Sequence, residues 1–283
     1  MDIFSFWDQD RAKAPKAVQI CLDRWEELNP GHRLHVLDEA DLRSIVTDLP
    51  FDVGLLPIQA RSNILRIRLL RQHEGAWVDS TLLPLVPLDR WKDLYMGTTG
   101  LFMFAGRPAQ WRLGNFFLLA EKGNHFIAAL DDATRAYWTH PRERFDLMLP
   151  PTRPVGPRRT PRSLFTPGKG WQHVRFNWKW HFDTLYPVSA EGRRGRFYPY
   201  FWHHYLMMQL IQTDPKVRAI VDAMTYRNHE LCHTVQHLRQ VLGDDFPKAI
   251  PGALLCSPVQ KLDWRLDWPD SVFEQPDIDR VLI

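Results

Sequence analysis

The chain of 283 residues is long enough for one large α/β domain or two small ones, and its hydrophobic content of 45% is ordinary for a folded globular protein. A net charge of +3 is too small to indicate a nucleic-acid-binding protein, and no stretch approaches the ~20 apolar residues that a membrane-spanning helix needs. The three cysteines lack paired spacing, which favours free thiols in a reducing cytosol, and the amino terminus lacks the basic start and cleavage site of a signal peptide.

The first eighty residues alternate between predicted strands and helices. The expected elements are a strand at residues 3–7, a helix at 15–28, a second strand at 34–37 and a short helix at 41–46. A longer helix is predicted after Pro57, and Gly75 is predicted to end it in the left-handed conformation. Residues 76–78 then form a short apolar strand with Asp79 at its carboxyl end. This order predicts a doubly wound, mostly parallel sheet, in which ligands bind at the carboxyl ends of the strands.

The rest of the chain is predicted to add strands and helices around a segment of unusual composition. The expected elements are an extended connection at residues 82–88, strands at 100–105 and 116–120 around a turn at Arg107–Pro108, helices at 124–138, 201–211, 215–226 and 229–242, and a short strand before Gln260. Residues 141–200 carry 12 Lys or Arg against 4 Asp or Glu, a local net charge of +8, and seven prolines lie between Pro141 and Pro167. This composition is typical of a surface insertion, a lid or acceptor-binding loop, or a patch that attracts anionic lipid or glycan.

Three polar side chains interrupt the apolar surface of the helix that follows Pro57. Ser62, Asn63 and Arg66 fall inside its apolar arc and are neighbours at helical spacing. A buried arginine needs a partner, because an unpaired interior charge is costly. Asp79 closes an apolar strand, where a core role is not evident. We interpret Arg66 and Asp79 as parts of a ligand site, and a buried ion pair is the alternative for Arg66.

These residues belong to a longer pattern. It reads S-N-I-L-R at residues 62–66, H-E-G at 73–75 and W-V-D-S-T at 77–81. The pattern resembles the S-D-x-x-R … G-G-x-W/Y-x-D-x-D/T signature of the capsular polysaccharide synthesis proteins, a group related to glycosyltransferase family 32 and the glucosylating toxins. Further resemblances are I-F-S-F-W at 3–7, C-L-D-R-W through N-P-G at 21–31, Y-F-W-H-H-Y at 200–205 and Q-K-L at 260–262. The chain departs from the family pattern at Asn63, Glu74 and Gln260, where Asp, Gly and His are usual.

The resemblance implies a GT-A type glycosyltransferase fold, which is Rossmann-like with a mostly parallel sheet flanked by helices, here with added carboxyl-terminal helices. It implies one domain over residues 1–283, with a nucleotide-sugar-binding core at 1–140, a basic insertion at 141–200 and a helical part at 201–283. The implied activity is the transfer of a hexose, with retention of configuration, from a nucleotide-diphosphate sugar such as a UDP-sugar. The acceptor would be a glycan or lipid-linked glycan in bacterial capsule or surface polysaccharide synthesis. The resemblance places such a protein on the cytoplasmic side of the membrane. The basic segment is expected to add peripheral contact to anionic lipid at the inner face of the membrane, and the small net charge indicates no nucleic-acid partner.

The resemblance also assigns a divalent metal, Mn²⁺ or Mg²⁺, to the leaving diphosphate. Asp79 is the expected ligand of the metal or of the ribose, and one carboxylate is enough for such an ion, because it needs only one or two when phosphates and water complete the shell. Thr81 stands at the place of the second Asp of the signature and supplies a weaker hydroxyl ligand. Gln260 is expected to add a further oxygen, and Lys261 is expected to act as a point charge on the diphosphate.

The remaining expected site residues would hold the sugar and the base. Arg66 and Asn63 are expected to bind sugar hydroxyls, and Asn63 lacks the charge-assisted acceptor of the usual Asp. Ser62 either joins them or closes a hydrogen bond within its helix. Trp7 stacks on the uracil of the nucleotide or fills the core of its strand.

Two other functions are weighed against this one. The residues His229, Glu230 and His233 form an H-E-x-x-H pattern, which binds zinc in metallopeptidases when it lies on an α-helix. A chain with 12 histidines produces this pattern easily, and no downstream Glu offers a third ligand, so an exposed helix face is the preferred interpretation. The second alternative is a sugar-nucleotide or glycan-binding protein that has lost catalysis, which the departures at Asn63 and Glu74 keep open.

Overall fold

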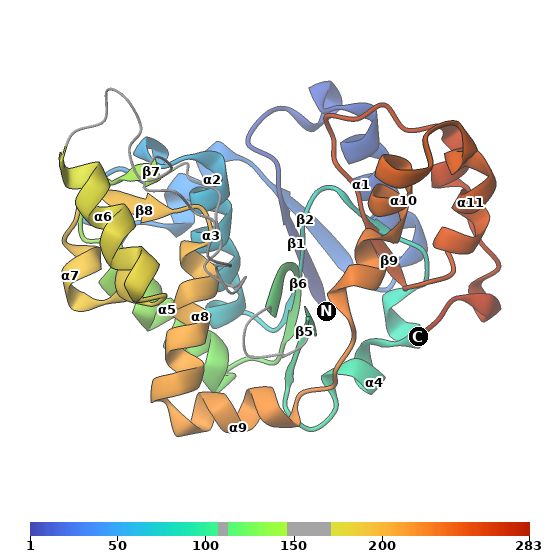
Figure 1. Ribbon diagram of the computed structural model, residues 1–283. Coiled ribbons are helices and arrows are strands. Elements are labelled where there is room, and N and C mark those ends of the chain that lie inside the picture. Colours follow the sequence, from blue (N-terminus) through green and yellow to red (C-terminus); the bar gives the residue numbers. More distant parts are fainter. Residues whose placement is uncertain (107–112, 146–170) are drawn as a thin grey trace.

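The computed structural model describes residues 1–106, 113–145 and 171–283, and its centre is a five-stranded mixed sheet (Figure 1). The strands are β1 (Asp2–Phe6), β2 (Arg33–Leu37), β3 (Gly75–Val78), β5 (Leu101–Ala105) and β6 (Leu113–Ala120), in the order β2-β1-β3-β6-β5. Strand β1 is parallel to β2 and β3, whereas β6 is antiparallel to β3 and β5. The predicted α/β class with a sheet between helices is confirmed, and the arrangement is compatible with a Rossmann-like fold.

Helical crossovers build the parallel part of the sheet. Helix α1 (Lys16–Leu28) connects β1 to β2, and α2 (Glu39–Ile45) with α3 (Ile58–Gln72) connects β2 to β3. Asp38 ends β2 and caps α2, because its side chain accepts hydrogen bonds from the backbone of Ala40 and Asp41. Since the three strands are parallel, their carboxyl ends meet at one edge of the sheet.

The two faces of the sheet are covered by different helices (Figure 1). Trp77 of β3 belongs to a core cluster with α3, α5 (His125–Tyr137) and α8 (Trp202–Thr213), whereas its neighbours Ala76 and Val78 belong to a cluster with α1 and α11 (Phe246–Ala253). This alternation is the two-residue period of a strand with apolar residues on both faces.

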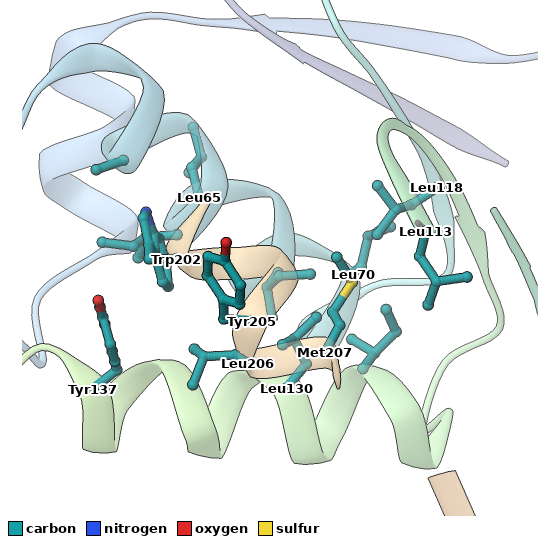
Figure 2. Packing of buried hydrophobic residues seen from close by; sticks show 14 of the residues in the cluster. Leu65, Leu70, Leu113, Leu118, Leu130, Tyr137, Trp202, Tyr205, Leu206 and Met207 are labelled. Atoms are coloured by element: carbon teal, nitrogen blue, oxygen red, sulfur yellow. The ribbon is translucent and has the colours of Figure 1, made fainter. Parts of the chain in front are cut away.

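Figure 2 shows the first of these clusters, in which α8 packs against α3 and α5. Leu65 and Leu70 extend from α3, Leu130 from α5, and Leu206 and Met207 from α8, and all five are buried. Burying one such side chain contributes about 1.5–3 kcal/mol. Helix α8 therefore packs through buried apolar side chains against α3, the helix that carries Arg66.

The remaining described elements extend this core. Strand β4 (Leu82–Pro84) pairs with β9 (Val259–Lys261), and β7 (Glu143–Phe145) pairs with β8 (Phe197–Pro199). The other helices are α4 (Lys92–Met96), α6 (Trp171–Phe182), α7 (Ala190–Arg193), α9 (Pro215–Ala223) and α10 (Thr234–Leu242). The short 3₁₀ helices are η1 (Arg11–Lys13), η2 (Val53–Leu55), η3 (Leu88–Arg90), η6 (Tyr186–Val188), η7 (His229–His233), η8 (Gly243–Asp245), η9 (Asp270–Phe273) and η10 (Ile278–Arg280).

Gly75 does not have the predicted role. Helix α3 ends at Gln72, His73 follows with an extended backbone, and Gly75 is the first residue of β3 without a left-handed conformation. A Cβ atom at this glycine would lie 2.5 Å from the backbone oxygen of Asp2 in β1. Glycine is needed here because the two strands approach closely. The prediction that Gly75 ends the helix in the left-handed conformation is therefore wrong.

The predicted helix at residues 229–242 is also corrected. Residues His229–His233 form the 3₁₀ helix η7, and the α-helix α10 begins only at Thr234. Asn228 caps η7 through its side-chain oxygen, which accepts from the backbone of Glu230. The H-E-x-x-H pattern therefore does not lie on an α-helix.

The basic segment at residues 141–200 begins and ends in regular structure, namely β7 at one end and α6, α7 and β8 at the other. The predicted turn at Arg107–Pro108 and most of the proline-rich stretch lie outside the described residues. Among the helices that the structure describes, none has both the length and the apolar character that crossing a membrane requires.

Candidate functional site

The carboxyl ends of β2, β1 and β3 place Asp38, Trp7 and Asp79 along one edge of the sheet. The other two strands reach the same edge, because β6 starts and β5 ends beside the carboxyl end of β3. The backbone N–H of Asp79 donates to the carbonyl of Phe116 in β6 at 2.9 Å. The sheet therefore holds the backbone of Asp79 rigidly while its side chain projects beyond the strand.

The Asp79 carboxylate is the centre of a charged cluster. Its Oδ1 accepts hydrogen bonds from Arg66 Nη2 at 3.2 Å and from Trp77 Nε1 at 3.0 Å, and its Oδ2 lies 3.0 Å from Lys261 Nζ. The side chain of Arg66 is 4% exposed, that of Lys261 20% and that of Asp79 25%. Solvent and ligands can therefore reach the carboxylate, although the arginine behind it is closed off.

The electrostatics of this cluster favour an ionised carboxylate with a net positive surround. Burial by itself raises the pKa of Asp79, but the charges of Lys261 and Arg66 oppose it and hold the pKa below its ordinary value. Two cations and one anion leave the cluster with a net charge of +1 at neutral pH. Such a cluster attracts an anionic ligand such as a diphosphate.

Arg66 is oriented by a shell of fixed acceptors. It donates to Ser62 Oγ at 3.0 Å and to the backbone carbonyl of Asn115, and its guanidinium lies 4.9 Å from the centre of the Trp77 ring. Asn63 joins this shell indirectly, since its Oδ1 accepts from Asn115 Nδ2 at 3.0 Å. The structure therefore brings Ser62, Asn63, Arg66 and Asp79 together. Ser62 accepts its hydrogen bond from Arg66 within the same helix, which is one of the two roles predicted for it.

Lys261 reaches the cluster from a distant part of the sequence. Strand β9 pairs with β4 so that Lys261 lies opposite Leu82, and Lys261 Nζ donates to Thr81 Oγ1 at 2.6 Å. Thr81 and Lys261 are thus neighbours of Asp79, as their predicted roles require.

Gln260 does not join the cluster. Adjacent residues of a strand point to opposite faces, so Gln260 points away when Lys261 points towards Asp79. Gln260 is fully buried, its Oε1 accepts from the backbone of Val235 at 3.2 Å and its Nε2 donates to the carbonyl of Leu231 at 2.9 Å. The prediction that Gln260 supplies an oxygen to a metal at Asp79 is wrong, because this side chain instead ties η7 and α10 to β9.

Of the predicted metal ligands, the Asp79 carboxylate and the Thr81 hydroxyl therefore remain as the residues that would hold a divalent metal. Both are now bonded to Lys261, which a metal would have to displace. Within the described part of the chain there is no cluster of three or more His, Cys, Asp or Glu side chains that could hold a metal ion. The two ligands fit a Mg²⁺ or Mn²⁺ ion that takes its other ligands from phosphate and water, and they do not fit a fully protein-bound ion.

A pocket of about 870 Å³ opens at the same edge of the sheet, at the carboxyl ends of β1 and β2. Its lining includes Trp7, Asp8, Val36, Asp38 and Arg43. The backbone of Trp7 is fixed to the end of β2 by a 3.0 Å hydrogen bond, and its ring meets the Trp264 ring edge-on at 6.0 Å between centroids. Trp7 thus lines the pocket and also packs against the small core cluster of Ala14, Val18 and Leu22, so both of its predicted roles stay predictions. The pocket has the volume of a small-molecule site.

The histidines of the H-E-x-x-H pattern lie next to one another without forming a metal cage. The ring centroids of His229 and His233 are 6.2 Å apart with planes at 85°, and His229 Nε2 lies 2.9 Å from Glu230. The absence of a described three-ligand cluster and the 3₁₀ geometry both count against a zinc peptidase.

Two contributors to the site were missed from the sequence. Trp77 donates to Asp79 and packs under Arg66, which follows from the two-residue period that puts residues 77 and 79 on one face of β3. Asn115 links Arg66 to Asn63, and nothing local distinguishes it from any polar residue at the start of a strand.

These features define a mixed α/β protein with an anion-attracting site at the carboxyl edge of its sheet. Residues 1–149, which include every strand of that sheet, match the family model of the capsular polysaccharide synthesis proteins. The chain belongs to this family, and the predicted resemblance is confirmed. Comparison with curated proteins and with solved structures found no match. The wider relation to glycosyltransferase family 32 and the glucosylating toxins stays a prediction.

Proposed function

We propose that this protein is a glycosyltransferase of GT-A architecture that transfers a hexose from a nucleotide-diphosphate sugar, such as a UDP-sugar, to a glycan in capsule or surface polysaccharide synthesis. The observation that carries the proposal is the position of Asp79 at the carboxyl end of β3, bonded to Arg66 and Lys261, at the same edge of the sheet as the pocket at β1 and β2. Family membership supports the biological role.

The proposed donor lies along the sheet edge, from the pocket to Asp79. The nucleoside occupies the pocket, where the Trp7 ring is available for stacking on a flat base. The diphosphate lies beside Lys261, whose charge stabilises the negative charge that develops on the leaving group. Arg66, held by Ser62 and Asn115, orients the Asp79 carboxylate that faces the ligand.

A divalent ion, Mn²⁺ or Mg²⁺, would be held by Asp79 and Thr81 and would act as a Lewis acid on the diphosphate. The protein's own part is to bring the donor's anomeric carbon into a fixed position and to stabilise the departing diphosphate. Retention of configuration follows from the family resemblance alone. We further propose that the whole chain acts as one transferase domain on the cytoplasmic side of the membrane.

The test is a panel of nucleotide sugars screened against the purified protein by thermal shift, with and without manganese. We expect one donor to raise the melting temperature more than its bare nucleotide does, and more with manganese than without. Release of nucleotide diphosphate from that donor on addition of a glycan acceptor would establish transfer. Donor binding without any turnover would instead favour the sugar-nucleotide-binding alternative. Absence of a shift with every nucleotide and nucleotide sugar would refute both.

A further inference from the structure

Helix α6 carries aromatic side chains on two opposite faces. Phe176 and Trp180 are 4% and 7% exposed, and the Trp180 ring lies 5.8 Å from that of Tyr205 in α8. Trp178 and Phe182 are 53% and 70% exposed. A step of two residues along an α-helix turns the side chain by about 200°, so Trp178 points away from the core that Phe176 and Trp180 help to fill. The inner face accounts for the packing of α6, and the outer rings need a different explanation.

The two outer rings form one apolar surface. Trp178 and Phe182 are neighbours at helical spacing, and their ring centroids are 4.9 Å apart. Figure 1 shows α6 with α7 at the outer edge of the molecule, away from the central sheet. Single exposed apolar residues are ordinary on protein surfaces, whereas adjacent large ones mark an interaction site. We call Trp178 and Phe182 the outer aromatic pair.

Basic side chains accompany the outer aromatic pair. Arg175 Nη2 lies 2.9 Å from Glu191 Oε1, and Lys179 Nζ contacts the same carboxylate. Glu191 belongs to the first turn of α7, so these ion pairs hold α7 beside α6. Arg193 and Arg194 follow Glu191 at the end of α7, and Arg194 is exposed. The two helices therefore combine an outward apolar surface with an excess of positive charge.

The charge of this part of the chain favours an anionic partner. Residues 171–200 contain five Lys or Arg against two Asp or Glu, a net charge of +3. The single carboxylate of Glu191 balances only one of the two cations that it contacts on α6. A surface with a net positive charge attracts anions and repels other cations.

We propose that α6 and α7 form a membrane-docking surface, in which Trp178 and Phe182 enter the interfacial region of a bilayer that contains anionic lipid. This inference goes beyond the proposed function and does not depend on it. The composition of the basic segment predicts an electrostatic attraction only, whereas the outer aromatic pair adds the apolar contact. Stable binding of a peripheral protein takes two such signals, because a single one gives weak and reversible attachment.

The shape of the surface favours a bilayer over other partners. The rings stand on the convex outer side of a helix, whereas sugar rings and other small ligands are held in concave sites. A bilayer interface is soft enough to accept two protruding rings. Tryptophan is enriched at this depth of the bilayer, because its ring is largely apolar and its indole N–H can still reach water or a headgroup.

The experiment is vesicle sedimentation with the full-length protein and vesicles of phosphatidylcholine, alone or mixed with phosphatidylglycerol. The variants are Trp178→Ala, Phe182→Ala and the conservative Trp178→Phe. Trp264→Ala is the matched control, because Trp264 is an exposed tryptophan on another part of the chain. Thermal unfolding of each variant shows that its fold is intact. Quenching of tryptophan fluorescence by brominated lipid, compared between wild type and Trp178→Phe, reports whether residue 178 enters the bilayer.

We expect the wild type to bind vesicles with phosphatidylglycerol, and each alanine variant to bind them about three- to tenfold more weakly. Trp178→Phe and Trp264→Ala should bind as the wild type does, and Trp178→Phe should lose most of the quenching by brominated lipid. The inference is overturned if the wild type does not bind anionic vesicles, if the alanine variants bind them equally well, or if Trp264→Ala weakens binding as much.

Two other partners are distinguished by the same set of variants. Sedimentation equilibrium without lipid would reveal a dimer, and a dimer that Trp178→Ala dissociates would make this surface a protein interface and overturn membrane docking. Hyaluronate serves as an anionic polysaccharide probe. Binding of hyaluronate but not of vesicles by the wild type, lost in Trp178→Ala, would assign the surface to an anionic glycan and overturn the inference as well.

Discussion

Replacing Asp79 with Asn tests the charged cluster most directly, because the amide has nearly the shape of the carboxylate but no charge. Hydrogen bonds to charged groups contribute about 1.5–3 kcal/mol, and Asp79 makes such contacts to Arg66 and Lys261. Because the carboxylate is partly exposed, we expect the lower part of this range as a loss of stability. Domains are stable by about 5–15 kcal/mol, so the fold should persist with a melting temperature lowered by roughly 3–6 °C.

Donor binding should respond to the same change in a metal-dependent way. Without metal, Asp79→Asn raises the net charge of the cluster from +1 to +2, so UDP should bind as tightly as to the wild type or more tightly. With manganese, the neutral amide is a poor ligand for a hard cation, and affinity should fall about ten- to a hundredfold. Opposite responses in the two conditions cannot arise from general loss of structure.

Titration calorimetry with UDP and UDP-sugars, with and without manganese, provides the measurement. Asp222→Asn, an exposed carboxylate on α9, is the matched control and should bind donors normally. Arg66→Lys keeps the charge but loses the planar fork that Ser62 and Asn115 orient, so it should bind bare UDP almost normally and lose its preference for the sugar-bearing donor. If Asp79→Asn binds every donor with manganese as tightly as the wild type, Asp79 is not the metal ligand and the site assignment fails.

Four further outcomes are expected. Gly75→Ala should destabilise the protein by about 1–3 kcal/mol in denaturant unfolding, because its Cβ meets the β1 backbone, whereas Gly31→Ala, with open space around it, should not; equal stability of the two variants would contradict this. Protein purified without added metal should carry well under one zinc per chain, and stoichiometric zinc that His233→Ala removes would restore the peptidase alternative. Burial holds the pKa of His203 well below its ordinary value, so as the pH falls below about 6.5 the unfolded state binds a proton that the folded state does not, and the free energy of unfolding decreases. The melting temperature should therefore fall from pH 7 to pH 5, and it should fall less steeply for His203→Phe. Liposomes with anionic lipid should recover the protein at low salt but not at high salt, as expected for a basic surface, and equal recovery with neutral liposomes would reduce residues 141–200 to an ordinary insertion.

Local sequence was sufficient for most elements of the fold. Proline before α3 and the short apolar run at β3 each act within a few residues, so their positions could be read from the chain. The capping carboxylate of Asp38 was missed, and the helix that it starts was predicted two residues too late. Gly75 was misread because its partner, the Asp2 backbone, is distant in sequence, and a glycine needed for close approach looks the same as one needed for a helix end. The 3₁₀ turn at His229 was missed because Asn228 and the edge of β5, rather than helical periodicity, fix its backbone.

The candidate site divides in the same way. The sequence by itself indicated the family and selected Arg66 and Asp79 as candidate site residues, since a charge in an apolar arc and an acid at a strand end are local signals. Tertiary structure alone decided that Lys261 pairs with Asp79 and that Gln260 does not. Both residues lie on one strand, and only the pairing of β9 with β4 sets which of them faces the cluster. A change of register by one residue would exchange their roles, because side chains of a strand alternate between its two faces.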